Sequence, residues 1–186
     1  EYGPVSTFVM DLRSERAANE EELTFFSSGQ FKELEEYLHA QRHAPVFLLG
    51  LSIPLAFAPN ALIHLGIAIA GEGSDVAERW WNKKADRSRK QLTDLLERNL
   101  ANHPKQIMVL VSGDVHAGSV SGMHIGSHPT YQLISSAVTN HEYALTRAVA
   151  ESLPHLGPWE QGDVRWELLK NEVAGRNPYS GLNIGL

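Results

Sequence analysis

The sequence predicts an α/β (α+β) protein, in which helices cover a mixed β-sheet within a single domain. Two observations lead to this prediction. Apolar runs typical of buried strands alternate with amphipathic helical segments over the first two thirds of the chain. In the last third the pattern changes to alternating polar and apolar residues separated by turns, which indicates antiparallel strands at one flank of the sheet.

Length and composition limit the possible functions. The 186 residues, 42% of them hydrophobic, suffice for one domain with a proper core. The net charge of −6 argues against a nucleic-acid-binding surface, which would need an excess of basic residues. Because the chain contains no Cys, a disulfide framework and thiolate chemistry are excluded. The longest apolar region, Ala61–Ala70, is broken by His64 and Gly66 and is too short to span a bilayer.

Three apolar runs are expected to form neighbouring strands: Val5–Leu12, Pro45–Leu51 and Ile107–Val111. The third is an unbroken β-rich run that ends at Ser-Gly, a pattern typical of a strand buried on both faces. Each run is followed by polar or charged residues. Connections of this length between strands are typical of crossover units, so these strands should be parallel.

Two amphipathic segments are expected to be the covering helices. The first begins at Ser27, and Gln30 stands at the S-x-x-Q spacing of a capping box. The second spans Asp86–Asn102, carries four leucines on its inner face, and ends before a His-Pro pair. The region Ala56–Asp75 between strand and helix is irregular and long for a loop, which suggests a lid or pocket wall.

The last third of the chain is expected to add short strands and one short helix. A hairpin is predicted from Ser119–Ile125 and Thr130–Ser136, with residues 126–129 as its turn. A short helix should follow to about Ser152, and further strands are predicted at 164–173 and 181–186.

The stretch after the third strand carries the main candidate site. Asp114 and His116 stand at i and i+2 just past the strand's carboxyl end, and Gly113 and Gly118 allow tight turns on either side. Ligands of open α/β sheets bind at this edge, and both side chains are suitable ligands for hard or borderline cations. The alternative interpretation is that Asp114 merely caps a turn through its side-chain oxygen.

Arg13 is the candidate for binding an anionic substrate. It follows the first strand within Asp11-Leu12-Arg13-Ser14, and a guanidinium there could fork onto phosphate oxygens. The remaining histidines, including His124 and His128 around the hairpin turn, are interpreted as structural or surface residues.

Several fragments together resemble the PhoD-like (alkaline phosphatase D) family of metallophosphoesterases, in order and in approximate spacing over about residues 1–145. These fragments are Asp11-Leu12-Arg13-Ser14, the helix with Gln30, Leu34 and Leu38, Ser52-Ile53-Pro54, the segment from Arg79-Trp80 through Arg87 to Leu95, and Ser112-Gly113-Asp114-Val115-His116-Ala117-Gly118. The S-G-D-V-H motif is the most specific of them. The resemblance implies the C-terminal part of a four-layer αββα sandwich.

The resemblance also implies a metal-dependent phosphatase or phosphodiesterase. A two-metal centre of iron, calcium, manganese or zinc would activate a water molecule and neutralise the phosphate ester. His116 matches the second His of the related Gly-His-x-His signature and is implied to be a metal ligand. Asp114 replaces the first His as a catalytic metal ligand or as the residue that orients His116. Ser52 stands where relatives carry another His ligand.

The ligands that the family carries before this region have no counterpart in residues 1–10. We therefore expect residues 1–186 to be one domain that belongs to a larger catalytic domain, with the N-terminal part as its partner, and we expect the isolated chain to be inactive. The family's usual export favours an extracytoplasmic location. The alternative is a catalytically silent binding or structural domain that retains the fold. A Ser-His hydrolase is a weaker possibility, because no G-x-S-x-G motif occurs.

Overall fold

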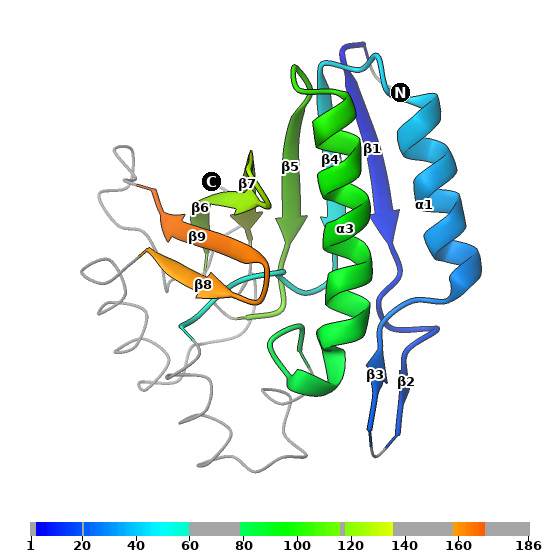
Figure 1. Ribbon diagram of the computed structural model, residues 1–186, viewed down its shortest axis with the longest axis vertical. Helices are drawn as coiled ribbons and strands as arrows, with labels where there is room; N and C mark the ends of the chain where they lie inside the picture. The colour runs from blue at the N-terminus through cyan, green and yellow to red at the C-terminus, as the bar shows by residue number, and fades with distance from the viewer. Residues whose placement is uncertain (1–2, 20, 60–78, 116–117, 136–157, 170–186) are drawn as a thin grey trace.

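One seven-stranded sheet forms the body of the protein (Figure 1). The computed structural model describes residues 3–19, 21–59, 79–115, 118–135 and 158–169. The spatial order of the strands is β1-β4-β5-β7-β6-β9-β8. Their bounds are β1 Val5–Met10, β4 Val46–Leu51, β5 Ile107–Ser112, β6 Ser119–Ile125, β7 His128–Ile134, β8 Trp159–Gln161 and β9 Val164–Leu168. A separate two-stranded ribbon pairs β2 (Ala17–Ala18) with β3 (Leu23–Thr24).

The sheet is mixed, as predicted. The pairs β1–β4, β4–β5 and β5–β7 are parallel, whereas β6 pairs antiparallel with both β7 and β9, and β9 pairs antiparallel with β8. The register aligns Met10 with Leu51 and Gly50 with Val111. The carboxyl ends of β1, β4 and β5 therefore meet at one edge of the sheet.

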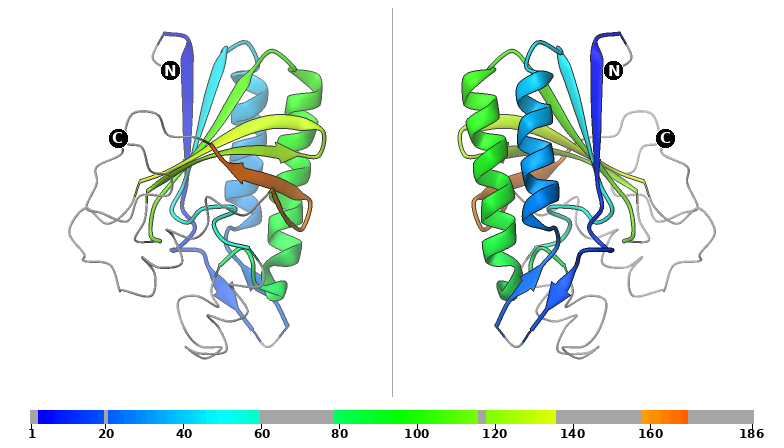
Figure 2. Two further views of the ribbon diagram at one scale, coloured as in Figure 1. Left: turned by 90° about the vertical axis from the view of Figure 1, so that its left-hand side faces the viewer. Right: turned by 90° about the vertical axis from the view of Figure 1, so that its right-hand side faces the viewer.

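The two long helices lie together on one face of the sheet, α1 spanning Ser28–Ala40 and α3 spanning Asp86–Asn102 (Figure 2). A 3-10 turn at Lys83–Ala85 precedes α3. The predicted cap of α1 is confirmed, because the Ser27 hydroxyl oxygen accepts a hydrogen bond from the backbone N–H of Gln30. The second hydrogen bond that a capping box predicts, from the backbone N–H of Ser27 to the side chain of Gln30, is not formed, so this part of the prediction is wrong. The Gln30 side chain instead donates to Asp11 and Glu15, which lie beyond the helix.

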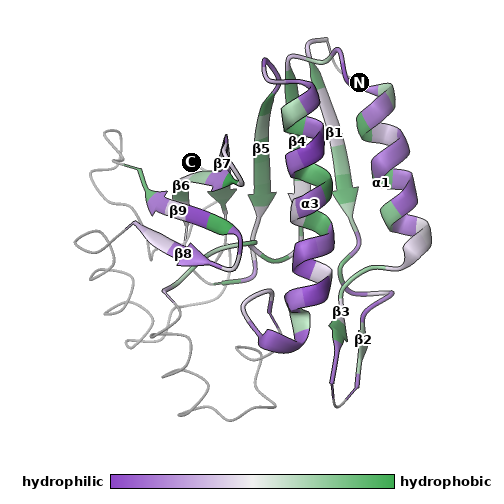
Figure 3. Cartoon of the chain, in the orientation of Figure 1, coloured by the Kyte–Doolittle hydropathy of each residue, from purple (hydrophilic) through white to green (hydrophobic). Residues whose placement is uncertain are grey.

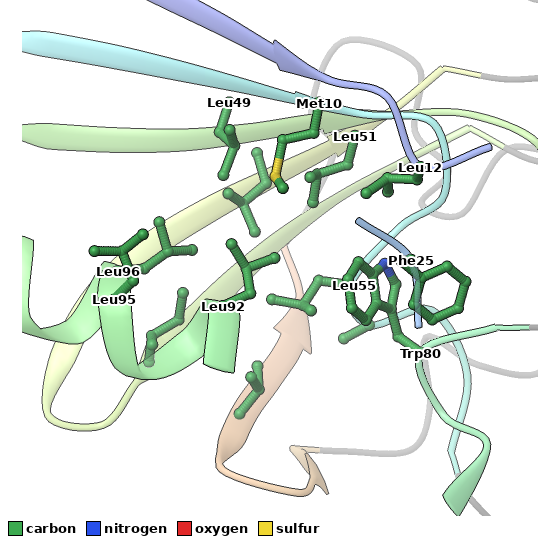
Figure 4. Close-up of a cluster of buried hydrophobic side chains, with 14 of the residues drawn as sticks. Met10, Leu12, Phe25, Leu49, Leu51, Leu55, Trp80, Leu92, Leu95 and Leu96 are labelled. Atoms are coloured by element: carbon green, nitrogen blue, oxygen red, sulfur yellow. The ribbon is translucent and has the colours of Figure 1, made fainter. Parts of the chain in front are cut away.

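The core lies between this face and the helices. Leu92, Leu95 and Leu96 of α3 point toward Leu49 and the neighbouring strand residues (Figure 4). At the carboxyl edge of the sheet the fully buried Trp80 packs on Phe25, with ring centroids 4.2 Å apart. The Trp80–Phe25 contact joins the segment before α3 to the segment after β3, so it closes the core at the edge where the strands end.

The opposite face of the sheet is apolar but only partly covered. Val9, Ile107 and Tyr131 are 72%, 50% and 46% exposed, and the strands β4 and β5 are largely hydrophobic in Figure 3. The prediction that Ile107–Val111 is buried on both faces is therefore wrong for the described part of the chain. Its buried residues alternate with partly exposed ones, because the helices cover only one side. Because parallel strands are generally covered on both faces, this partly exposed face is unusual for a sheet of this kind.

Other differences concern short elements. The hairpin between β6 and β7 turns on two residues, Gly126 and Ser127, because Ile125 still pairs with His128. Gly126 has a φ of 57°, the left-handed conformation that such turns require. The strand β8 and the ribbon β2–β3 were not predicted, and β9 ends at Leu168, before the predicted end. The predicted helix to about Ser152 and the strand 181–186 lie outside the described residues, as does most of the irregular region Ala56–Asp75.

A buried amide fixes the segment that follows β4. Gln132 lies in a row of side chains across the sheet, beside Leu110 of β5 and Ser121 of β6, and is fully buried. Its Oε1 accepts hydrogen bonds from the backbone N–H groups of Leu55 (2.8 Å) and Ala56 (3.4 Å), and its Nε2 donates to the carbonyl of Ala56. One side chain thus satisfies backbone groups that no strand pairs.

No described helix is both long and apolar enough to cross a membrane.

We predict that Gln132→Ala destabilises the fold by roughly 2–4 kcal/mol, because it leaves the N–H of Leu55 and the carbonyl of Ala56 buried without partners. Urea denaturation should show a lower midpoint with an unchanged m value. Glu167→Ala, an exposed position on β9, serves as the control and should stay within about 0.5 kcal/mol of the wild type. A Gln132→Ala variant as stable as that control would contradict the role of the amide.

Candidate functional site

The candidate site lies where β1, β4 and β5 end. Asp11 directly follows β1, Ser52 follows β4, and Gly113 and Asp114 follow β5. Since these three strands are parallel and adjacent, their following residues gather at one edge. Ser52 is exposed at the middle strand. Arg13 and Asp114 come from the two outer strands of the three and meet across it.

A tight turn after β1 fixes the backbone of Arg13. The Oδ1 atom of Asp11 accepts hydrogen bonds from the backbone N–H groups of Arg13 and Ser14, both at 2.9 Å. The Ser14 side chain, followed by these backbone donors, lowers the pKa of Asp11 to about 2. Asp11 is thus ionised under all physiological conditions and acts as the organiser of the turn.

A second set of hydrogen bonds ties the turn after β1 to the start of α1. Gln30 Nε2 donates to the carbonyl of Asp11 at 3.0 Å. The carboxylate of Glu15 accepts hydrogen bonds from the N–H and the hydroxyl of Ser27 and from Gln30, and these bonds, the Ser27 hydroxyl first, lower the pKa of Glu15. The position of Arg13 is therefore set by the helix as well as by the strand.

Asp114 has an unusual backbone conformation. Its φ of 65° is the one positive value at a non-glycine residue among the described parts of the chain. Asp is one of the few residues that tolerate this left-handed region. The preceding Gly113 is needed for space, because a Cβ atom there would lie 2.9 Å from the carbonyl oxygen of Ser135. The backbone conformation after β5 thus requires a glycine at position 113 and, at position 114, a residue that tolerates a positive φ.

Two arginines converge on one oxygen of Asp114. Arg13 Nη2 lies 3.2 Å from Asp114 Oδ2, and Arg79 Nη1 forms a short ion pair with the same oxygen. Arg79 Nη2 also donates to the Asp114 carbonyl at 3.4 Å. The side chain of Arg13 is 68% exposed, that of Asp114 is 35% exposed, and that of Arg79 is only 11% exposed. The cluster is therefore buried at Arg79 and open to solvent at Arg13.

The structure brings together two of the three predicted site residues, Arg13 and Asp114. His116 lies outside the described residues. Arg79 was not predicted as a site residue. The one signal in the sequence was its place before Trp80, since a residue next to a buried tryptophan is carried close to the core.

The hydrogen bonds around Asp114 leave one of its two carboxylate oxygens to act as a metal ligand. Its Oδ2 is occupied by the two arginines, while its Oδ1 accepts no hydrogen bond from any residue that the structure describes. Within those residues no three His, Cys, Asp or Glu side chains are grouped as a metal site. A metal centre at this edge would therefore need His116 and further ligands from outside the described residues.

Comparisons with known proteins point to one fold. No protein-family model matches the chain, and no curated protein matches it. The solved structure of PhoD superposes on it with a TM-score of 0.58 and 18% sequence identity. The superposition covers 84% of this chain and 32% of that one, so the chain spans about a third of the length of PhoD. The chain thus has a PhoD-like fold over most of its length.

The hydrogen bonds of the turn that holds Arg13 predict how the ionisation of Asp11 and the stability of the fold depend on pH. NMR titration should give Asp11 a midpoint of about 2, and Ser14→Ala should raise it toward the usual 3.8. Because the pKa is lower in the folded state, ionised Asp11 stabilises the fold above about pH 4, and this contribution is lost as the pH falls from 3.8 to about 2. Ser127→Ala, in the exposed hairpin turn, should leave the midpoint unchanged. A wild-type midpoint near 3.8 would show that the turn is not formed as described.

Proposed function

We propose that this chain supplies the C-terminal share of a PhoD-like metallophosphoesterase, an enzyme that hydrolyses phosphate esters. The observation that carries the proposal is the meeting of Arg13 and Asp114 at the carboxyl edge of a PhoD-like sheet. The residues of this edge combine a carboxylate with the exposed guanidinium of Arg13 and the buried one of Arg79. A phosphate ester needs both types of group: cationic donors for its oxygens and a metal ligand nearby.

In this proposal Asp114 and His116 are catalytic residues that bind the metal, and Arg13 binds the substrate. The carboxylate of Asp114 and an imidazole suit iron, calcium, manganese or zinc to different degrees, with the imidazole favouring the transition ions. When bound, such ions supply an activated water molecule and neutralise charge on the phosphoryl group. The exposed guanidinium of Arg13, whose backbone is held by the Asp11 turn, would orient the substrate's non-bridging oxygens.

The partner that we propose for the chain is the rest of a larger catalytic domain. Two findings support this. The superposition leaves two thirds of PhoD unmatched, and the sheet face away from the helices is apolar yet partly exposed at Val9, Ile107 and Tyr131. A second sheet packed on that face would cover it and complete a four-layer αββα sandwich. The PhoD likeness also favours an extracytoplasmic location.

A second candidate function is a silent binding domain that retains the fold. The observation that favours it is the occupation of Asp114 Oδ2 by two arginines, which leaves the carboxylate less available to a metal. Ser52 also favours the silent domain, because the resemblance places a His ligand of the metal at this position. Metal content separates the two candidates.

The experiment uses the full product of the gene. Bound metal is measured by elemental analysis, together with hydrolysis of an aryl phosphate monoester and an aryl phosphate diester, for the wild type and His116→Ala. We expect metal and activity in the wild type. His116→Ala should lose activity by at least about 100-fold, since changing even an outer partner of a metal ligand can reduce activity that much.

The matched control is His124→Ala, which removes an exposed histidine of β6 outside the strand-end edge and should keep full activity and metal content. A wild-type protein that stays metal-free and inactive with added divalent ions would contradict the enzyme proposal and favour the binding domain. Activity that survives in chelator would contradict the metal-dependent mechanism.

A further inference from the structure

The two arginines flank Asp114 Oδ2 as they would flank an oxygen of a bound anion. Both guanidiniums lie within hydrogen-bonding reach of this single atom, and they come from segments that are far apart in the sequence. Arginine presents its donors in a planar fork that matches carboxylate and phosphate oxygens alike. The carboxylate of Asp114 therefore marks a position between two guanidiniums where an oxyanion can be held.

The charges at this cluster are unequal. Within the part of the chain that the structure describes, one carboxylate faces two guanidiniums, and the better buried of the two, Arg79, makes contact with both the side chain and the carbonyl of Asp114. Arg13 donates one side-chain hydrogen bond to a described residue, the one to Asp114, and stays 68% exposed. At this exposure its guanidinium is accessible to a ligand from solvent.

The backbone at Asp114 serves this arrangement. A left-handed conformation is unfavourable at a non-glycine residue, and such outliers persist only where surrounding contacts fix them. Here the fixing contacts are the ion pairs to Arg79 and Arg13. At the other side, the Asp11 turn and Gln30 hold the backbone that carries Arg13. Both arms of the cluster are therefore held in place before a ligand binds.

We propose that Arg79 and Arg13 form a phosphoryl-binding site and that Asp114 is its positioning residue, which orients both guanidiniums. The proposal rests on the proposed function for the identity of the ligand, a phosphoryl group, but not on the metal. Arg79 becomes a substrate-binding residue beside Arg13. The phosphoryl oxygens share the guanidinium donors with Asp114 Oδ2, so the negative charge of Asp114 opposes the ligand even as its oxygen aligns the arginines.

The test measures binding of inorganic phosphate to the metal-free, chelator-treated full chain, by ³¹P NMR titration or calorimetry at low salt. Wild-type protein should bind phosphate, and Arg13→Gln and Arg79→Gln should each weaken binding tenfold or more. Asp114→Asn should bind phosphate more tightly, because it keeps an oxygen for the arginines, tolerates the left-handed backbone and removes the opposing charge. Asp114→Ala removes the same charge together with the oxygen that aligns the arginines, so it should bind phosphate less tightly than Asp114→Asn; equal binding by the two variants would refute the positioning role.

The matched control is Arg98→Gln, which makes the same change of charge on an exposed arginine of α3 that pairs with Glu35. It should bind phosphate like the wild type. Since Arg79 is buried, Arg79→Gln must be checked for folding by circular dichroism, whereas Arg13 is exposed and its variant decides the outcome if Arg79→Gln unfolds. No phosphate binding by the wild type, or unchanged binding in Arg13→Gln, overturns the proposal.

The phosphate measurement is independent of the hydrolysis experiment. Phosphate binding that depends on Arg13 in a protein that never hydrolyses esters would leave this site intact and refute the enzyme. Hydrolysis that survives Arg13→Gln and Arg79→Gln with unchanged KM would refute the arginine site and leave the enzyme intact.

Discussion

Parallel pairing of β1, β4 and β5 is the constraint on which the rest of the structure depends. It aligns the ends of three strands at one edge, so Asp11, Ser52 and Asp114 become neighbours although long stretches of sequence separate them. It also demands long crossover connections, and these supply α1 and α3 to one face of the sheet. The polar cluster and the apolar core are thus two results of the same strand order.

The same constraint explains which parts of the structure could be predicted from the sequence. Long periodic segments were predictable: α3 spans Asp86–Asn102 as expected, because its leucines recur on one face and a His-Pro pair follows. The position of Asp114 just past the carboxyl end of a strand could be predicted because it follows a strongly apolar run. The ribbon β2–β3 could not, since strands of two residues are too short for any alternation to show.

The contact of Arg79 with Asp114 could not be predicted, for a different reason. Its contact with Asp114 depends on where Trp80 packs in the core, and no local pattern encodes that packing. The same holds for Gln132, whose amide reads in the sequence as an ordinary polar residue of a strand but is fully buried against the backbone after β4. Contacts of polar side chains with partners far away in the sequence cannot be predicted from local sequence patterns, because they depend on how the strands are arranged.

The ion pair between Arg13 and Asp114 joins residues 101 positions apart in the chain. Closing so long a loop has an entropic cost, which must be met before the contact itself contributes anything. The pair is brought into register by the pairing of β1 and β5 with β4, so we expect it among the late interactions to assemble. A partly folded chain, even one with both helices formed, would therefore lack the proposed phosphoryl-binding site, and phosphate binding at that site would report the completed sheet.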